Sequence, residues 1–272
     1  MTTTSPAPRA TGHTITAHAR LRTAAVQRAD GTTGTRIHTL RSEPPLLLRI
    51  TGAATSDVFP ECHGPQIHLV AGAAGPLAGD QLHLDIDVAA GTTLFLREVG
   101  STLLLPGQHP DPSRTQTRIH VGPQATFTWE AQPIIAAQGC NHHNDIHITL
   151  DNDARLLLGE TIVLGRHAEQ PGDLQQRLRI SYGDKPLYAQ QLTIGTRAPG
   201  WAGPAITDAH QSLGSVLIVD TAIRLDNLTP APAPDTAISS LPGPGLLITA
   251  VAPDALTLNQ RLTTALHTAL AN

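Results

Sequence analysis

The sequence predicts an all-β protein of stacked β-strand pairs, either β-helix-like or a long sandwich, with one or two short helices. Polar and aliphatic residues alternate over several segments, and similar blocks recur about every thirty residues. Gly (23) and Pro (22) are frequent among the 272 residues, which indicates many chain reversals. Only 15% of the residues are charged, below the usual share of roughly a quarter, and this argues against a solvated helical protein.

The chain begins with a segment of low complexity. Residues 1–12 are rich in Thr, Ser, Pro and Ala, a composition typical of a disordered tail. No clean boundary follows, so we expect a single β domain over residues 13–272. Within it, Gln81–Val88 is the clearest strand, since four aliphatic residues alternate with four polar ones. This period of two places the aliphatic side chains on one face.

A strand–turn–strand block recurs along the middle of the chain. Val88–Leu94, Val121–Phe127 and Leu150–Leu156 share one layout, and they begin 33 and then 29 residues apart. A looser fourth copy runs from Ile180 to Leu187. Repeats of this length indicate units that bury their apolar faces by stacking on one another. Plain hairpins in an ordinary sandwich remain the alternative.

Helix signals are few. Pro253–Leu270 is the best, because Asp254 can cap it and a leucine recurs every four residues from Leu258. A second, weaker helix is expected near Thr207–Ser212. The Pro- and Ala-rich segment Thr229–Thr236 is predicted to be a loop.

Bulk properties exclude several classes of protein. The formal net charge is −4, and no basic run resembles a nucleic-acid footprint. Two lone cysteines, Cys62 and Cys140, make no disulfide framework and fit a reducing compartment. The N-terminus lacks the apolar core of a secretory signal, and no apolar stretch is long enough to span a bilayer. We therefore expect a soluble, cytoplasmic protein.

Common catalytic signatures are missing. The sequence has no phosphate-binding loop, no dinucleotide fingerprint, no nucleophile elbow and no H-E-x-x-H. The cluster Cys140, His142 and His143 has metal-ligand chemistry. Adjacent histidines on a strand point to opposite faces, however, so they seldom share an ion. A polar loop between strands is the other interpretation, and we assign no structural metal here.

Three carboxylates stand in unusual settings. Asp80 follows a turn of small residues and either caps that turn or serves a site. Glu160 interrupts an apolar run and shares a face with Leu156 and Leu158; it either lines a wet interior or is solvated outside. Glu130 ends a predicted strand. An alternative function is a carbohydrate-active or sugar-binding β-helix protein that uses Asp80 and Glu130 as paired carboxylates, although aromatic residues make up only 3% of the chain.

Four ordered segments resemble one known family. Residues 69–88 look like its small-residue loop, Gly-Asp and alternating strand, and residues 90–104, 125–135 and 154–166 resemble its next three motifs. The family is that of the urease accessory protein UreD, also called UreH. The resemblance covers about residues 45–195, and the C-terminal helix fits the family's ending. Ala78 stands where the family usually has the first Gly of Gly-Gly-Asp, and such departures mark a divergent member.

The resemblance implies a scaffold and not an enzyme. UreD-like proteins bind apo-urease and a UreF-like partner, which recruits the nickel-carrying GTPase UreG. A water-filled passage through UreD is proposed to guide Ni²⁺ toward the urease active site. Asp80, Ser101 and Glu160 match polar positions along that passage and are expected to bind Ni²⁺ transiently. The resemblance implies no tightly bound cofactor, only Ni²⁺ in transit. A conduit needs weak oxygen ligands, since a Cys/His cage would retain the ion.

Overall fold

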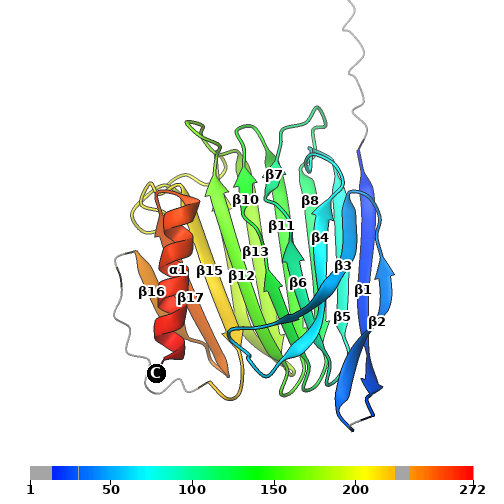
Figure 1. Cartoon of the computed structure of the whole chain (residues 1–272). Helices are drawn as coiled ribbons and strands as arrows, with labels where there is room; N and C mark the ends of the chain where they lie inside the picture. Colours follow the sequence, from blue (N-terminus) through cyan, green and yellow to red (C-terminus); the bar gives the residue numbers. More distant parts are fainter. Residues whose placement is uncertain (1–13, 30, 224–232, 234, 272) are drawn as a thin grey trace, which may run out of the picture.

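Two β-sheets lie face to face, with the strands running side by side along the length of the molecule (Figure 1). The structure is a computed structural model that describes residues 14–29, 31–223, 233 and 235–271. The expected N-terminal tail and most of the loop expected at 229–236 lie outside these residues. The described part is mostly strand with one C-terminal helix, which confirms the all-β prediction.

We name the smaller, seven-stranded sheet sheet A and the ten-stranded one sheet B. Sheet A contains, in spatial order, β14 (Lys185–Ile194), β13 (Asp173–Tyr182), β11 (Asn141–Leu150), β8 (Ser113–Val121), β5 (Gln81–Val88), β1 (Thr16–Gln27) and β2 (Thr33–Arg41). Sheet B contains β16 (Thr236–Ser240), β17 (Gly245–Ala252), β15 (Ser212–Val219), β12 (Arg155–Leu164), β9 (Thr126–Glu130), β6 (Thr93–Glu98), β4 (His63–Ala71) and β3 (Leu46–Thr55). Two short strands, β7 (Thr102–Leu104) and β10 (Ile134–Ala136), pair beside β12.

Three coils form the centre of the molecule. Each coil runs up one strand of sheet A, turns, and continues in sheet B, as β5–β6, β8–β9 and β11–β12, and successive coils pair in parallel in both sheets. Each turn is closed by an equivalent backbone hydrogen bond. These bonds run from Thr92 N to Ala89 O, from Ala125 N to Gly122 O and from Ala154 N to Asp151 O, and each is 3.1 Å long. The stacked repeat inferred from the sequence is confirmed.

One turn position has a left-handed backbone in all three coils. Gly91, Gln124 and Asp153 occupy it, with φ of 66°, 57° and 59°. Glycine adopts this conformation without strain, whereas Gln and Asp are held there by the stack: Gln124 N donates to Asn152 O of the next turn at 3.3 Å.

The fourth sequence copy has a different path. β13 and β14 pair with each other in antiparallel fashion through the two-residue turn Gly183–Asp184. The chain therefore turns back within sheet A instead of crossing to sheet B. Because antiparallel pairs need only a tight two-residue turn, this copy ends the stack on the sheet A side.

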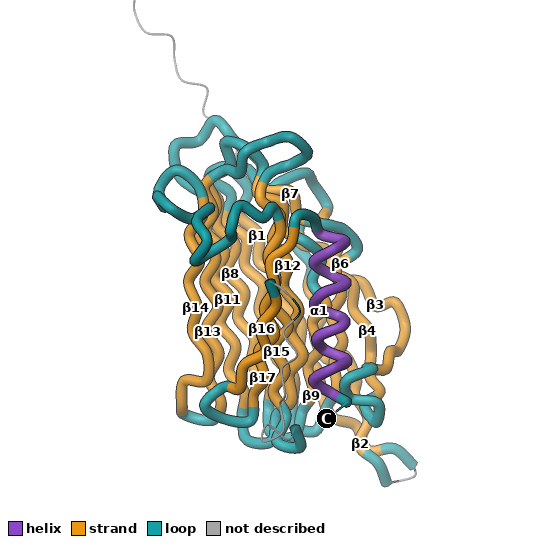
Figure 2. The backbone as a smooth tube through the Cα atoms, turned by 90° about the vertical axis from the view of Figure 1, so that its left-hand side faces the viewer, coloured by secondary structure: helices purple, strands orange, loops and turns teal. Residues whose placement is uncertain are grey.

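The helix α1 (Ala255–Leu270) packs on β15, β16 and β17 of sheet B, as Figure 2 shows from the end of the stack that carries it. Asp254 caps it as predicted and accepts a hydrogen bond from Thr257 N at 2.8 Å. Leu258 and Leu262 are buried, but Ala265 and Ala269 then replace Leu266 and Leu270 on the buried face. A spacing of four drifts by about 40° per step around a helix, so the leucine stripe leaves the sheet.

The prediction of a second helix near Thr207–Ser212 was wrong. Residues 201–209 form consecutive turns, and Ser212 begins β15. Asp208 and Ala209 have φ of 47° and 58°, which a right-handed helix excludes. No helix within the described ranges is long and apolar enough to cross a membrane.

Candidate functional site

The space between the sheets is dry at one end and polar at the other. On β11, the inward side chains are His142 and Asn144 and then Ile146 and Ile148, all buried. β8 follows the same order, with inward Ser and Thr before Ile119 and Val121. The apolar ends lie beside the shared turns and form the main core between the sheets. The polar ends lie toward the opposite loops.

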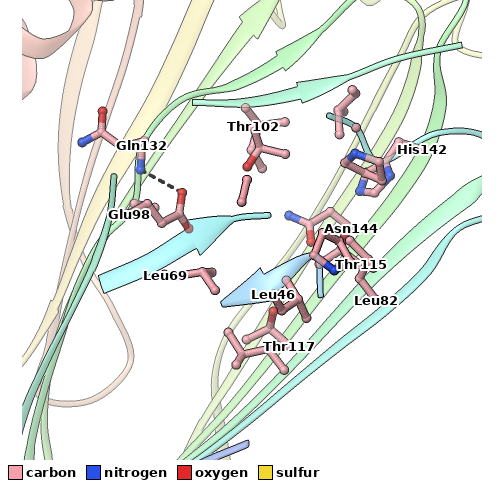
Figure 3. A pocket seen from close by; sticks show the side chains of 18 of the residues that line it. Leu46, Leu69, Leu82, Glu98, Thr102, Thr115, Thr117, Gln132, His142 and Asn144 are labelled. Atoms are coloured by element: carbon pink, nitrogen blue, oxygen red, sulfur yellow. Dashed lines mark hydrogen bonds between the residues drawn. The ribbon is translucent and has the colours of Figure 1, made fainter. Parts of the chain in front are cut away.

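A cavity of about 120 Å³ occupies the polar end, which is room for several water molecules. Both sheets line it, together with loop residues of 73–76, 100 and 131–132. In Figure 3, Glu98 and Gln132 stand at one side of the cavity, and Thr115, His142 and Asn144 stand at the other. The lining is mainly apolar, so its few polar groups determine what the cavity can bind.

A chain of side-chain hydrogen bonds leads from sheet A to Glu160 in sheet B. Asn144 Nδ2 donates to Gln176 Oε1 at 2.8 Å, and Gln176 Nε2 donates to Glu160 Oε1 at 2.6 Å. Asn144 and Gln176 are neighbours in the parallel register of β11 and β13. Glu160 is half-buried and lines the cavity. The question left open by the sequence is thus answered: Glu160 faces the interior, on the same side of β12 as Leu156 and Leu158.

Two carboxyl groups in the cavity hold protons unusually tightly. Burial raises the pKa of Glu160 to about 7, although the Gln176 hydrogen bond opposes this. Burial also raises the pKa of Glu98 to about 7, against hydrogen bonds from Gln132 N at 3.1 Å and Trp129 Nε1 at 3.3 Å. Near neutral pH both groups can therefore lose their proton at little cost in free energy.

Burial has the opposite effect on the imidazole in the cavity. It lowers the pKa of His142 to about 3, with a smaller contribution from His143. His142 is therefore neutral, and its Nδ1 lies 2.8 Å from Ser113 Oγ. A neutral imidazole carries one unprotonated ring nitrogen, which can accept a hydrogen bond or bind a metal ion.

We expect Glu160→Gln to stabilise the free protein at alkaline pH. A carboxyl whose pKa is higher in the folded state than its ordinary value of 4.5 stabilises the fold fully below about pH 4.5, and this contribution is lost as the pH rises through about 7. Gln stays neutral and still accepts from Gln176. In urea denaturation, the free energy of unfolding of the variant should exceed that of the parent at pH 8. At pH 5 the two values should lie closer together. An equal difference at both pH values would contradict this.

Asp80 lines the cavity and also ties two chain segments together. It is buried, and its Oδ1 accepts from Ile15 N at 2.8 Å while Oδ2 accepts from Leu77 N at 2.9 Å. The turn-capping interpretation therefore describes its present contacts. Its expected contact with an ion in transit stays a prediction.

Replacing Asp80 by Ala should lower the free energy of unfolding by about 1–3 kcal/mol, because two partly buried N–H groups lose their acceptor. Urea denaturation measures this. Asp87→Ala is the matched control, since Asp87 lies on the outer side of β5 and, among the described residues, its side chain contacts the exposed His120. A loss as small as that of the control would show that Asp80 does not hold the turn.

The other sequence candidates lie apart from this cavity. Ser101 is exposed and does not line it, although its neighbours Gly100 and Thr102 do; its contact with Ni²⁺ stays a prediction. Glu130 is exposed at the end of β9 and pairs with Arg97 at 2.9 Å. Asp80 and Glu130 therefore do not face one another across a common site, as paired catalytic carboxylates would.

The cluster at the start of β11 is divided between the faces of the sheet. Cys140 is buried in an apolar cluster, His142 points into the cavity, and His143 lines a groove on the outer side. The polar-loop interpretation was wrong for the two histidines, which belong to the strand. Among the described residues, no three His, Cys, Asp or Glu side chains are grouped closely enough to hold a metal ion.

The sequence analysis did not identify Glu98 as a residue of the site. It lies on the same face of β6 as the buried Leu94 and Leu96, and this alternation was the available signal. A charge at the end of a strand is usually solvated, so the pattern alone gave no reason to place it inside.

Comparisons with known proteins agree on one family. The family model described as UreD urease accessory protein matches residues 16–272. A urease accessory protein UreD of Parafrankia sp. (strain EAN1pec) is 39% identical over 263 residues, 89% of this chain and 86% of the relative. UreD of Frankia alni is 37% identical over 288 residues, covering 95% of each chain, and UreD 2 of Saccharopolyspora erythraea is 38% identical over 275 residues, covering 96% and 92%.

Proposed function

Because the chain belongs to the UreD family of urease accessory proteins, we propose that it is a non-catalytic scaffold of urease maturation. In this proposal it binds apo-urease and a UreF-like partner, which brings a UreG-like GTPase, and it guides Ni²⁺ toward the urease active site. The two cysteines are free thiols in the structure, which suits a reducing cytoplasm.

The observation that carries the proposal is the polar end of the cavity. Glu98 and Glu160 offer single carboxylates from different strands, β6 and β12, and His142 offers one neutral nitrogen from the opposite sheet. Oxygen ligands hold nickel more weakly than thiolates or several imidazoles do. Donors supplied one or two at a time favour release of the ion to the next position.

The rigid walls of the cavity also support transport. Each wall is a stack of in-register strands that continues into a dry core at the other end. Strands fixed in this way hold the carboxylates in place without a bound ion, so an entering ion meets ligands that are already oriented.

Reconstitution with purified proteins tests the proposal. The full chain is mixed with apo-urease, a UreF-like partner and a UreG-like GTPase, and complex formation and nickel-dependent urease activity are measured separately. We expect the chain to be retained with apo-urease and the UreF-like partner, and activation to require it. Equal activation without the chain would overturn the proposal, as would turnover of a polysaccharide by the isolated chain.

A further inference from the structure

The outer face of sheet A carries an ordered set of charged and imidazole side chains. On its five parallel strands, alternate residues point away from the core, and nearly all of these are polar. The outward arginines of these strands are Arg20, Arg22, Arg114, Arg118, Arg177 and Arg179, and β2 adds Arg36 and Arg41. The outward aspartates are Asp85, Asp87, Asp145 and Asp173. The face is thus positive in a chain whose formal net charge is −4.

The parallel register arranges these groups in rows across the strands. Asp85, Arg118, His147 and Arg179 form one row, and Gln81, Arg114, His143 and Gln175 form another. Neighbouring strands lie about 4.8 Å apart, so successive side chains in a row lie close together. Arg179 and Arg177 are both held by Asp145, at 3.1 and 3.5 Å. Side chains held in this way lose less conformational entropy when they bind.

A groove crosses the middle of this face, between β5 and β13. Its lining includes Arg114, His143 and Arg177. Burial lowers the pKa of His143, and the nearby guanidinium groups of Arg114, Arg197 and Arg177 lower it further. Asp145 also lines the groove and pairs with Arg177, and Arg197 pairs with Asp173 at 3.7 Å. Arg114 therefore supplies the groove's uncompensated positive charge. Arg114 and Arg118 form no ion pair with any residue that the structure describes.

We propose that the outer face of sheet A docks an acidic surface of a partner protein, with the Arg114–His143–Arg177 groove receiving the partner's carboxylates. Arginine pairs with carboxylates through two parallel hydrogen bonds and is enriched in protein interfaces. The face measures roughly 30 by 25 Å, about 750 Å² from strand spacing and rise, close to the ~800 Å² per partner of a standard interface.

The composition of the face favours a protein over other anionic partners. Aspartates stand in the same rows as the arginines, and they would repel a continuous phosphate backbone. The five parallel strands present no outward Phe, Tyr or Trp for base stacking and no large outward apolar side chain for insertion into a bilayer. The helix α1 packs on sheet B and leaves this face uncovered. The inference uses sheet A alone, so it stands or falls separately from nickel transit through the cavity.

Fluorescence anisotropy with the full chain tests the proposal. The probes are a labelled Glu-rich peptide, the same peptide with Gln for Glu, a single-stranded oligonucleotide, and vesicles of anionic lipid. We expect the Glu peptide to bind at low salt, to dissociate at high salt, and to bind more tightly than the other three probes. Arg114→Glu and Arg118→Glu should each weaken its binding by about tenfold or more.

The matched control is Arg49→Glu, an exposed charge reversal on β3 of sheet B. This variant should bind the Glu-rich peptide with the affinity of the parent. Arg114→Lys keeps the positive charge and should retain most of the parent's affinity for the peptide. Thermal unfolding verifies that each variant is folded. Failure of the Glu peptide to bind, tighter binding of the oligonucleotide or the vesicles, or an equal loss in Arg49→Glu would each overturn the proposal.

Discussion

Glu160→Ala should reduce nickel-dependent activation of urease by roughly tenfold or more, the usual scale for loss of a group that orients or supplies a metal ligand. Glu160 is the carboxylate of sheet B that meets the Asn144–Gln176 chain from sheet A. Its removal takes away the acceptor of the Gln176 Nε2 hydrogen bond and one of the two cavity carboxyl groups whose pKa is raised to about 7. Activation by purified partners with added Ni²⁺ measures the effect.

The matched control for this prediction is Glu130→Ala. Glu130 is also a sheet B carboxylate, but it is exposed, paired with Arg97 and outside the cavity. Both variants should still bind apo-urease and the UreF-like partner in pull-downs, because neither changes a backbone contact between strands. If Glu160→Ala activates urease as well as Glu130→Ala does, the conduit role of Glu160 is wrong.

Leu262→Asp should release α1 from sheet B and lower the free energy of unfolding by about 4 kcal/mol or more, since it buries an unpaired charge in place of an aliphatic side chain. Leu262 is buried against β15, where Gly214 allows a close approach: a Cβ there would lie 3.1 Å from Leu258 and 3.2 Å from Leu262. Urea denaturation and the yield of soluble protein measure the loss.

Leu256→Asp provides a control in the same helix. Leu256 is 70% exposed, so the same chemical change there should shift the free energy of unfolding by less than about 0.5 kcal/mol. Similar losses for the two variants would show that the helix responds to charge in general and not to its contact with the sheet.

The strand pattern of the fold could be predicted because alternation reports the inward face directly. Leu82, Leu84 and Ile86 are all buried, as their period of two requires. The direction of the chain after each turn was harder to predict. The turns at Gly91 and Gly183 are both small and polar, yet one crosses to the other sheet and one reverses in the same sheet. The shorter loop at Gly183–Asp184 was the signal for a hairpin.

The site was predictable only in part. Glu160 was identified because a carboxylate within an apolar run is costly unless it is used. Asn144 and Gln176 stand in ordinary alternating strands, and nothing local indicates that their ends of those strands border a cavity. That property depends on how far apart the two sheets stand, which is set by residues from many coils at once.

The division of the interior into a dry and a polar end has a consequence for the divergence of related sequences. Inward positions beside the turns, such as Ile148 and Val121, are fully buried and admit only aliphatic replacements of similar volume. Inward positions at the cavity, such as Thr115 and Asn144, border open space and can exchange one small polar group for another. Substitutions that change the lining of the cavity can therefore accumulate at one end of a strand while the other end preserves the fold.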